Sequence, residues 1–272
     1  MKTDLKTNIK AIIARAYVRI VAANREPSWW FTETLLPILS TAAYVYVYKA
    51  LEAPEEYTGF VILGGTMSAY WIFVLWGMAA QFYWEKEIGN LELYMIAPIS
   101  RMSILLGMAS GGVFLATTRA VFIFLAGSLI FKVDFSIVSF PKLFAVFVLT
   151  LVGLYGLGML FSSLFMLYGR EAWHGVTLLQ EPVHLLSGFF FPVKNLGFAV
   201  AFGASLIPMT LGLDAMRQLA FKEGAKSGFI NVNLEIIALV VLCIFFLVIS
   251  KYAWDFMEKL GKKEGRLTLR WQ

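Results

Sequence analysis

Residues 57–84 read YTGFVILGGTMSAYWIFVLWGMAAQFYW, and none of them is charged. A helix that crosses a lipid bilayer needs about 20 mostly apolar residues, so this run is long enough to cross it once. Acidic residues precede the run (Glu52, Glu55 and Glu56), and the charged triplet Glu85-Lys86-Glu87 follows it. The run therefore predicts a spanning helix with polar loops at both ends.

The composition of the whole chain agrees with this prediction. Of the 272 residues, 59% are hydrophobic and 15% are charged, and the mean hydropathy is +0.73. A soluble globular protein has about 45–50% apolar and about 25% charged residues. The net charge of +5 reflects basic residues gathered near the two ends of the chain, without interleaved aromatic residues. The composition predicts a membrane protein and argues against a nucleic-acid partner.

Uncharged or nearly uncharged runs recur along the sequence. We therefore expect an all-α membrane protein that forms a single transmembrane domain over residues 1–272. Six spanning helices are expected at residues 30–48, 58–83, 102–131, 143–169, 172–191 and 235–252. The fourth carries Gly153, Gly156 and Gly158, small residues that let neighbouring helices approach closely.

Segment 192–231 decides between six and seven crossings. Hydropathy alone would count residues 195–213 as a seventh span, which would place the two termini on opposite sides of the membrane. Residues 1–25 and 251–272 each carry six Lys or Arg residues, and basic flanking segments favour the cytoplasmic side. We therefore expect a protein of the cell membrane with both termini in the cytoplasm. Segment 192–231 would form a re-entrant hairpin and outer segment, because broken backbone is tolerated at membrane depth when protein covers it.

Residues 4–26 predict a helix that lies on the membrane surface. Its apolar residues share one helix face and are Ile9, Ile12, Ile13, Ala16 and Ile20. Basic residues flank this face, and the pair Trp29-Trp30 follows, as is typical of a membrane interface. The alternative is an amphipathic helix packed on the rest of the protein.

Residues 85–98 predict a short amphipathic helix on the cytoplasmic side, between the second and third spans. Ile88, Leu91 and Met95 share one face, and acidic residues in the first turn suit the positive end of the helix dipole. Pro98 ends the helix. A helix so placed could transmit a push from a soluble partner into two spans, and the alternative is a solvated connector.

Two blocks of the sequence resemble the permeases of ABC-2 type transporters, a family of exporter subunits. The first block comprises Glu85, Glu87, Gly89, Leu91, Glu92, Pro98 and Ser100, followed by Leu105-Leu106-Gly107. The second comprises 187–192, which read SGFFFP, and 208–217, which read PMTLGLDAMR. Their order on six spans extends the resemblance over nearly the whole chain. The chain departs from the family pattern at Met108 and at Leu196-Gly197, and the second departure leaves the shape of the outer hairpin open.

The resemblance implies a role for each segment. Helix 4–26 would be the elbow helix, 85–98 the coupling helix that docks on an ABC ATP-binding subunit, and 192–231 the outer re-entrant helices near the exit of the translocation path. The coupling residues would be Glu85, Glu87, Ile88, Gly89, Leu91, Glu92, Met95 and Pro98. The outer re-entrant motif would comprise Gly188, Phe190, Pro192, Pro208, Asp214 and Arg217.

The sequence contains no P-loop of the form G-x-x-x-x-G-K-[ST], so we expect the ATPase on a separate chain. ATP and Mg²⁺ would be bound by that partner, and no cofactor and no enzymatic activity are expected in this chain. The expected function is that of an exporter permease that dimerises with a second copy or a homologous permease. A drug, a lipid, a glycan or an ion remains open as the substrate.

Ionisable residues within spanning helices are costly and are therefore candidates for the translocation path. These candidates are Arg119, His174, Glu181 and His184. The last three lie on one stripe of the fifth span, which would face either the path or the dimer seam, or would hold a purely structural Glu181–His184 pair. Arg119 would either form an ion pair with Glu181 or Glu33, or contact the substrate. Neither histidine pair has the H-E-x-x-H spacing of a zinc site, so no metal site is expected.

Two other functions compete with the exporter. An ion-coupled secondary transporter would show broken helices in both halves of the chain, and the sequence shows only one broken segment. A membrane-embedded enzyme would use Glu181 with His174 or His184 as acid and base, and would need a cluster that converges from several spans.

Overall fold

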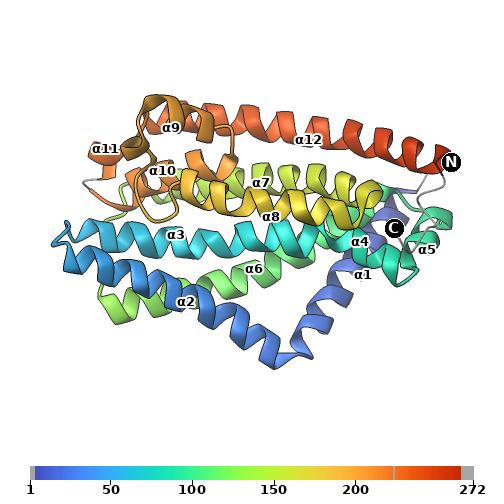
Figure 1. Cartoon of the computed structure of the whole chain (residues 1–272), viewed down its shortest axis with the longest axis horizontal. Helices are drawn as coiled ribbons and strands as arrows, with labels where there is room; N and C mark the ends of the chain where they lie inside the picture. The colour runs from blue at the N-terminus through green and yellow to red at the C-terminus, as the bar shows by residue number, and fades with distance from the viewer. Residues whose placement is uncertain (1–3, 223, 265–272) are drawn as a thin grey trace.

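A computed structural model describes residues 4–222 and 224–264 of the chain (Figure 1). Some helical side chains also lie outside the description, namely those of Pro27, Trp29, Phe82, Leu91, Glu92, Met95, Arg101, Met166, Leu167 and Arg170. The described residues form helices and no strand, which confirms the all-α prediction.

The helices of the described residues divide into long and short ones. The long ones are α1 (Leu5–Asn24), α2 (Pro27–Ala50), α3 (Glu56–Ile72), α6 (Arg101–Phe131), α7 (Phe140–Tyr168), α8 (Arg170–Leu186) and α12 (Val232–Lys263). The short ones are the π-helix η1 (Phe73–Ala79), α4 (Gln81–Glu87), α5 (Asn90–Ile96), the 3₁₀-helix η2 (Val193–Leu196), α9 (Phe198–Ala204), α10 (Pro208–Ala220) and α11 (Gly224–Ser227).

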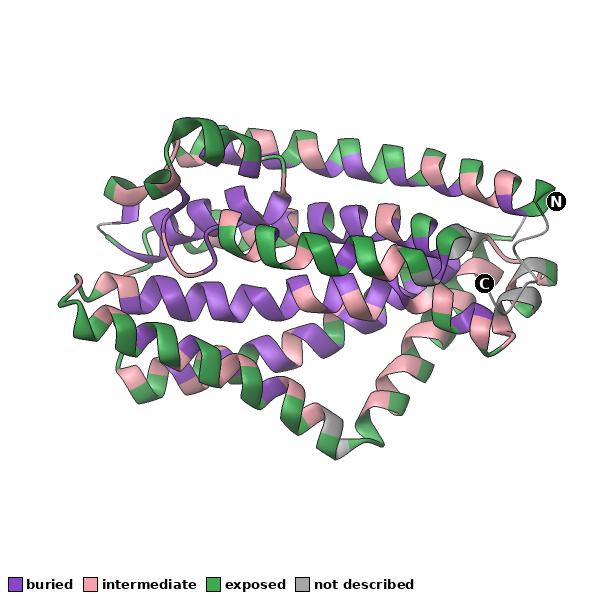
Figure 2. Ribbon diagram, viewed as in Figure 1, coloured by how far each residue is buried: buried purple, intermediate pink, exposed green. Residues whose placement is uncertain are grey.

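The uncharged run quoted above forms the centre of the bundle. It continues through α3, η1 and α4 over Glu56–Glu87, which at about 1.5 Å per residue is about 48 Å long. Most of this rod is buried, as the purple ribbon in Figure 2 shows. A helix that is apolar all round must be surrounded by other helices or lipid, and here α2, α6, α7 and α10 surround it.

Close helix contacts in the bundle depend on the predicted small residues. Gly153, Gly156 and Gly158 of α7 lie against Pro208, Phe246 and Val74, and a Cβ atom at any of the three glycines would come within 3.0 Å of that neighbour. The three glycines therefore bring α10, α12 and η1 onto α7, as the sequence predicted.

Four helical rods of the described chain are long and apolar enough to cross a membrane: Glu56–Glu87, Met102–Phe131, Phe140–Phe165 and Val232–Lys263. The bent pair α9–α10 would make five. The predicted spans 30–48 and 172–191 correspond to α2 and α8. Ser, Thr and Tyr side chains dilute the apolar character of α2, and α8 has only 17 residues. Because α2 is not apolar enough and α8 is not long enough to count as a spanning helix, the count of six spans remains a prediction.

The predicted re-entrant segment 192–231 folds into η2, α9, α10 and α11. The axes of α9 and α10 meet at an angle of 111°, so the chain turns back sharply at residues 205–207 instead of continuing as one straight span. Pro208 occupies the first turn of α10, where its missing N–H costs nothing. The broken backbone expected here is present.

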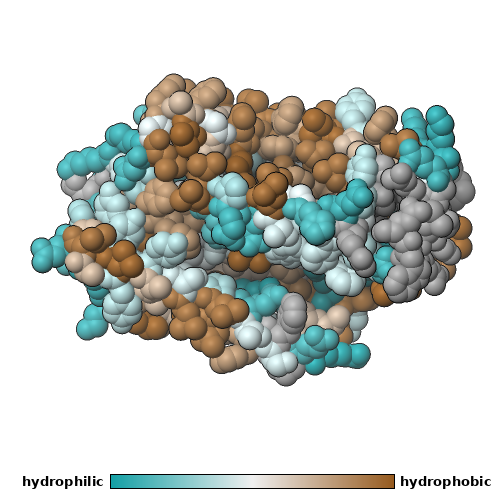
Figure 3. Space-filling model, viewed as in Figure 1, coloured by the Kyte–Doolittle hydropathy of each residue, from teal (hydrophilic) through white to brown (hydrophobic). Residues whose placement is uncertain are grey.

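The two ends of the bundle carry different elements. In Figure 1, α4, α5, the start of α1 and the end of α12 lie at one end, and α9 to α11 lie at the other. The space-filling view shows hydrophobic residues along α12 and hydrophilic ones toward both ends (Figure 3). The end that carries α4 and α5 is called the α5 end, and the end that carries α9 to α11 is called the α10 end.

The prediction of one continuous helix over residues 85–98 is wrong. The chain makes two short helices, α4 and α5, with a turn at Ile88 and Gly89 between them. Gly89 has a φ of 83°, in the left-handed region that only glycine adopts without strain. The apolar spacing 88, 91 and 95 predicted one helix because it does not reveal the backbone angle at Gly89.

Helix α1 packs on protein along part of its length. Gly107 and Gly111 of α6 let its backbone approach at Ile12 and Ala16. The opposite side of α1 remains exposed, including Ile13 and Tyr17. One face of α1 therefore packs on protein, as the alternative interpretation expected, and contact of the exposed side with a membrane stays a prediction.

Candidate coupling site

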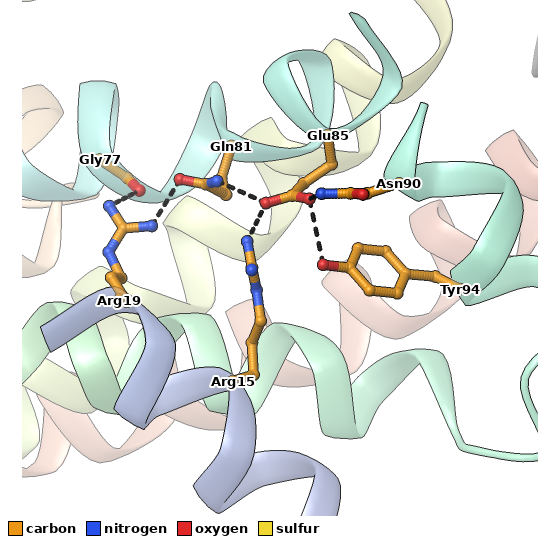
Figure 4. Close-up of polar contacts among 7 residues, drawn as sticks. All are labelled: Arg15, Arg19, Gly77, Gln81, Glu85, Asn90 and Tyr94. Atoms are coloured by element: carbon orange, nitrogen blue, oxygen red, sulfur yellow. Dashed lines mark hydrogen bonds and ion pairs between the residues drawn. The ribbon is translucent and has the colours of Figure 1, made fainter. Parts of the chain in front are cut away.

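The carboxylate of Glu85 is the centre of a polar cluster at the α5 end (Figure 4). Glu85 is only 2% exposed, although it follows directly on the apolar run. Arg15 of α1 forms an ion pair with it. Three further donors reach the same carboxylate: the side-chain amides of Gln81 at 2.8 Å and Asn90 at 2.9 Å, and the hydroxyl of Tyr94 at 3.0 Å. A buried carboxylate with a cation and three neutral donors is well compensated.

A second arginine extends this cluster into the π-helix. Arg19 donates to the side-chain oxygen of Gln81 at 2.6 Å and to the backbone carbonyl of Gly77. Gly77 lies in η1, and π-helical segments inside α-helices often mark functional sites. Gln81 therefore connects Arg19 to Glu85, and Arg19 itself reaches the π-helix.

Burial changes the proton affinity of two groups in this cluster. It lowers the pKa of Arg19 to about 10, with a further contribution from the nearby positive charge of Arg15. Burial also raises the pKa of the Tyr94 hydroxyl to about 12, and its hydrogen bond to Glu85 adds to this effect. Around neutral pH, Tyr94 therefore remains a neutral hydrogen-bond donor to the carboxylate.

The segment that carries this cluster also has exposed apolar side chains, which together we call its apolar face. Ile88 is 64% exposed, Leu93 59% and Ile96 80%. Pro98 is also exposed and Glu87 is half-buried. The side chains of Leu91, Glu92 and Met95, which the sequence analysis included among the coupling residues, lie outside the described part. An exposed apolar face backed by a fixed polar cluster can receive a partner protein.

Helix α5 and the loop that follows it contact the long helices. The backbone N–H of Ser100 donates to the side chain of Asn8 on α1 at 2.9 Å. Trp254 of α12 packs with Ile104, Leu105 and Met108 of α6, and Tyr94 lies against this group. Helix α5 and this loop therefore contact α1, α6 and α12.

A cavity of about 530 Å³ lies beside the Glu85 cluster, between α1, α2, η1 and α6. Its lining includes Arg15, Arg19 and Glu85, and also Arg119 and Glu33. The last two form an ion pair, one of the two pairings that the sequence analysis considered for Arg119. The pair joins α6 to α2, so Arg119 has a structural partner.

The predicted polar stripe of α8 lies mostly on the surface of the single chain. His174 and Glu181 are exposed, and hydrophilic residues are visible over α8 in Figure 3. His184 is partly buried and stacks on Phe189, with 4.6 Å between ring centroids. Gln180 accepts a hydrogen bond from the indole of Trp76 at 2.7 Å and donates to Glu181 at 3.3 Å. No ion pair joins Glu181 to His184 within the described chain.

The residues of the predicted outer motif lie at the α10 end. Two of them, Asp214 and Arg217, belong to a second polar cluster. Gly188 has a φ of 68° and turns the chain after α8, Phe190 stacks on Tyr44, and Pro192 is buried before η2. Asp214 and Arg217 of α10 are buried. Arg217 donates to the carbonyls of Phe189 (2.8 Å), Phe191 (3.1 Å) and Phe60 (3.2 Å).

Several residues of these clusters escaped the sequence analysis. At the α5 end they are the Glu85 partners Arg15, Gln81, Asn90 and Tyr94, together with Arg19, which donates to Gln81. At the α10 end they are Gln218 and Glu235. The arginines appeared as ordinary basic flanks of an amphipathic helix. Only the charge next to an uncharged run, at Glu85, was a signal in the sequence.

Comparison with known proteins adds a family match. The chain matches the family described as ABC-2 type transporter over residues 7–221. It is also similar to a protein named probable multidrug ABC transporter permease YbhR, from Escherichia coli K12 and from Escherichia coli O157:H7. The identity to each is 27% over 143 residues, which cover 52% of this chain and 38% of the relative.

Proposed function

The chain belongs to the ABC-2 type transporter family, and on this premise we propose that it is the permease of an ATP-driven exporter whose ATPase is a separate subunit. The observation that carries the proposal is the exposure of Ile88, Leu93 and Ile96 on the same short segment as the buried Glu85 cluster. Such a face suits an ATP-binding subunit, which would also bind ATP and Mg²⁺.

The Glu85 cluster would transmit the motion of that subunit. Glu85 faces into the chain, so its part would be positioning, whereas Ile88 and Ile96 would make contact. A shift of α5 would act on Glu85 through Asn90 and Tyr94, then on α1 through Arg15, and on η1 through Gln81 and Arg19. ATP could shift the equilibrium only to the extent that the partner binds one arrangement of this cluster better than another.

We further propose six crossings, with the α5 end in the cytoplasm and α2 and α8 as the two additional spans. Two features support this orientation: the start of α1 and the end of α12 lie at the same end of the bundle, and that end is rich in Lys and Arg. Single cysteines can test it in a Cys243→Ser background. Cysteines at positions 55 and 136 should react with an impermeant thiol reagent added outside cells, and one at position 262 should not.

A second copy, or a homologous permease, would cover the exposed polar stripe of α8. Polar side chains at membrane depth do not face lipid without cost, and His174 and Glu181 are exposed in the single chain. The substrate would pass along this seam. The relatives carry the name of multidrug permeases, which makes a drug-like compound the first substrate to test, ahead of a lipid, glycan or ion.

Co-purification tests the proposed partner. The tagged chain should retain an ABC ATP-binding subunit, and the double change Ile88→Asp with Ile96→Asp should reduce the retained amount at least about tenfold, since two charges would be desolvated in the interface. Leu5→Asp is the matched control, because Leu5 is an equally exposed apolar residue, 74% exposed, on α1. Transport by the chain alone, driven by an ion gradient, would support the secondary transporter instead.

A further inference from the structure

Two acidic side chains are buried together at the α10 end, away from the coupling site. Asp214 lies on α10 and is 2% exposed, and Glu235 lies in the first turn of α12 and has no exposed surface. Gln218, one turn after Asp214, lies between them. A carboxylate in such surroundings needs a cation or several hydrogen-bond donors.

The hydrogen-bond donors around this pair do not suffice. The side-chain nitrogen of Gln218 has three acceptors within reach: Oδ2 of Asp214 at 3.0 Å, Oε2 of Glu235 at 3.1 Å and the carbonyl of Ile230 at 2.8 Å. An amide nitrogen carries only two hydrogens, so one acceptor is left over. The backbone N–H of Phe229 serves Asp214 at 2.7 Å.

Glu235 also has a carboxylate oxygen without a hydrogen-bond partner in the described part of the chain. Its Oε1 atom is buried and has no hydrogen-bond partner among the described residues. The donor shortage around Gln218 and this unpartnered atom are separate observations, and both indicate one missing hydrogen.

The surrounding cations are engaged elsewhere. Arg217 interacts electrostatically with Asp214, Tyr48 and Tyr57. Its two terminal nitrogens donate to three backbone carbonyls, and its Nε–H has no partner among the described residues. On α7, Lys142 donates to Asn233 at 3.2 Å. Near α11, Lys194 donates to the carbonyl of Lys226 at 3.1 Å. Within the part of the chain that the structure describes, no ion pair reaches Asp214 or Glu235.

We propose that Asp214 and Glu235 form a proton-binding site, in which the two carboxyl groups hold one proton between them. Two adjacent buried carboxylates repel each other strongly when both are ionised, and sharing a proton relieves the repulsion. The proton supplies the missing hydrogen, so that Glu235 becomes a donor and Gln218 can serve its remaining acceptors.

The site holds the α10 end together. Asp214 accepts from Phe229 and Gln218 donates to Ile230, so the cluster fixes the loop that leads into α12. Gly228 of the same loop lies so close to Gln218 that a Cβ atom there would clash with it. Loss of the proton would leave two negative charges in this cluster and would loosen the loop from α10.

Infrared difference spectroscopy tests the site on the full chain in lipid nanodiscs at about pH 7, where an ordinary carboxyl group is ionised. The wild-type chain should show a protonated-carboxyl C=O band that Glu235→Gln lacks, since the amide carries its own hydrogens. Asp134→Asn, which changes an exposed acid at the same end, should keep the band. Absence of this difference would overturn the proposal.

Thermal unfolding between about pH 6 and about pH 8 gives a second readout. The wild type should lose stability relative to Glu235→Gln by about tenfold in the unfolding constant per pH unit, because the unfolded chain releases the proton. Parallel curves would contradict the proposal. So would stabilisation of the wild type alone by Na⁺ or Ca²⁺, which would indicate a metal cation in place of the proton. If Glu235→Gln does not fold, Asp214→Asn serves as the reciprocal variant with the same expected results.

Discussion

The two ends of the bundle bury acidic side chains in different ways. At the α5 end, one carboxylate, Glu85, meets an arginine and three neutral donors. At the α10 end, the buried arginine donates to backbone carbonyls, and Asp214 and Glu235 share few donors. In the first cluster a cation and neutral donors compensate the carboxylate, whereas the proposed second site requires a proton. Under the proposals above, the α5 end would transmit motion and the α10 end would hold a loop in place.

Removal of the central carboxylate should have the largest effect. Glu85→Ala leaves Arg15 buried without its partner, and breaking a buried pair in this way costs about 3–5 kcal/mol. The measurement is the thermal unfolding of the detergent-purified chain. Lys262→Ala, which breaks the pair with Glu258 at the same end, is the control and should cost less than about 1 kcal/mol because the Lys262 side chain is 55% exposed. Equal losses of unfolding free energy would show that the Glu85 cluster stabilises the chain no more than the control ion pair does.

Replacement of the buried arginine at the other end should cost less. Arg217→Lys retains the charge, but one ammonium group cannot reach the carbonyls of Phe60, Phe189 and Phe191 together. An unsatisfied buried acceptor costs about 1–3 kcal/mol, so we expect a loss of about 2 kcal/mol in unfolding free energy. If Arg217→Lys is as stable as the wild type, hydrogen bonds from the guanidinium group to these carbonyls do not contribute to stability.

The hydroxyl of Tyr94 provides a test with a pH signature. Tyr94→Phe should cost about 1.5 kcal/mol, the low end for a hydrogen bond to a charged group. The pKa of Tyr94 is raised to about 12 in the folded chain, against about 10 in an unfolded chain. Its stabilisation is therefore complete below about pH 10 and is lost as the pH rises toward about 12. Unfolding curves of wild type and Tyr94→Phe should converge over that range, and a constant difference would contradict the assignment.

The smallest effect is expected at the turn between α4 and α5. Gly89→Ala forces an alanine to a φ of 83°, which costs about 1 kcal/mol. Its effect on co-purification of the ATP-binding subunit should exceed its effect on unfolding, because the turn sets the angle of Ile88 relative to Ile96. Gly175→Ala is the control, since a Cβ atom there meets nothing within 4 Å. A variant that binds normally would show that the turn angle is unimportant.

The positions of the helices could be predicted from the sequence because they depend on the length and charge of each apolar run. The run 57–84 lies within Glu56–Glu87, and α6 and α7 begin and end within a few residues of the predicted spans. The bend between α9 and α10 also follows from local signals, namely the glycines and Pro208 that interrupt an apolar stretch.

The partners of each buried charge could not be predicted in this way. Nothing near Glu85 in the sequence distinguishes Arg15, 70 residues away, from other basic residues of α1. Glu235 has the appearance of an ordinary acidic residue in the first turn of a helix, where the helix dipole favours it. Its burial depends on the sharp turn that brings α10 against α12, which hydropathy does not reveal.

The ATPase rate of the co-purified ATP-binding subunit, measured with the chain in lipid nanodiscs, tests the central claim most directly. The wild type and Leu5→Asp should both change the ATPase rate of the subunit by the same factor, and Ile96→Asp should abolish that change. If the subunit hydrolyses ATP at the same rate with wild type, with Ile96→Asp and with no permease, the face at Ile88, Leu93 and Ile96 does not couple this chain to an ATPase.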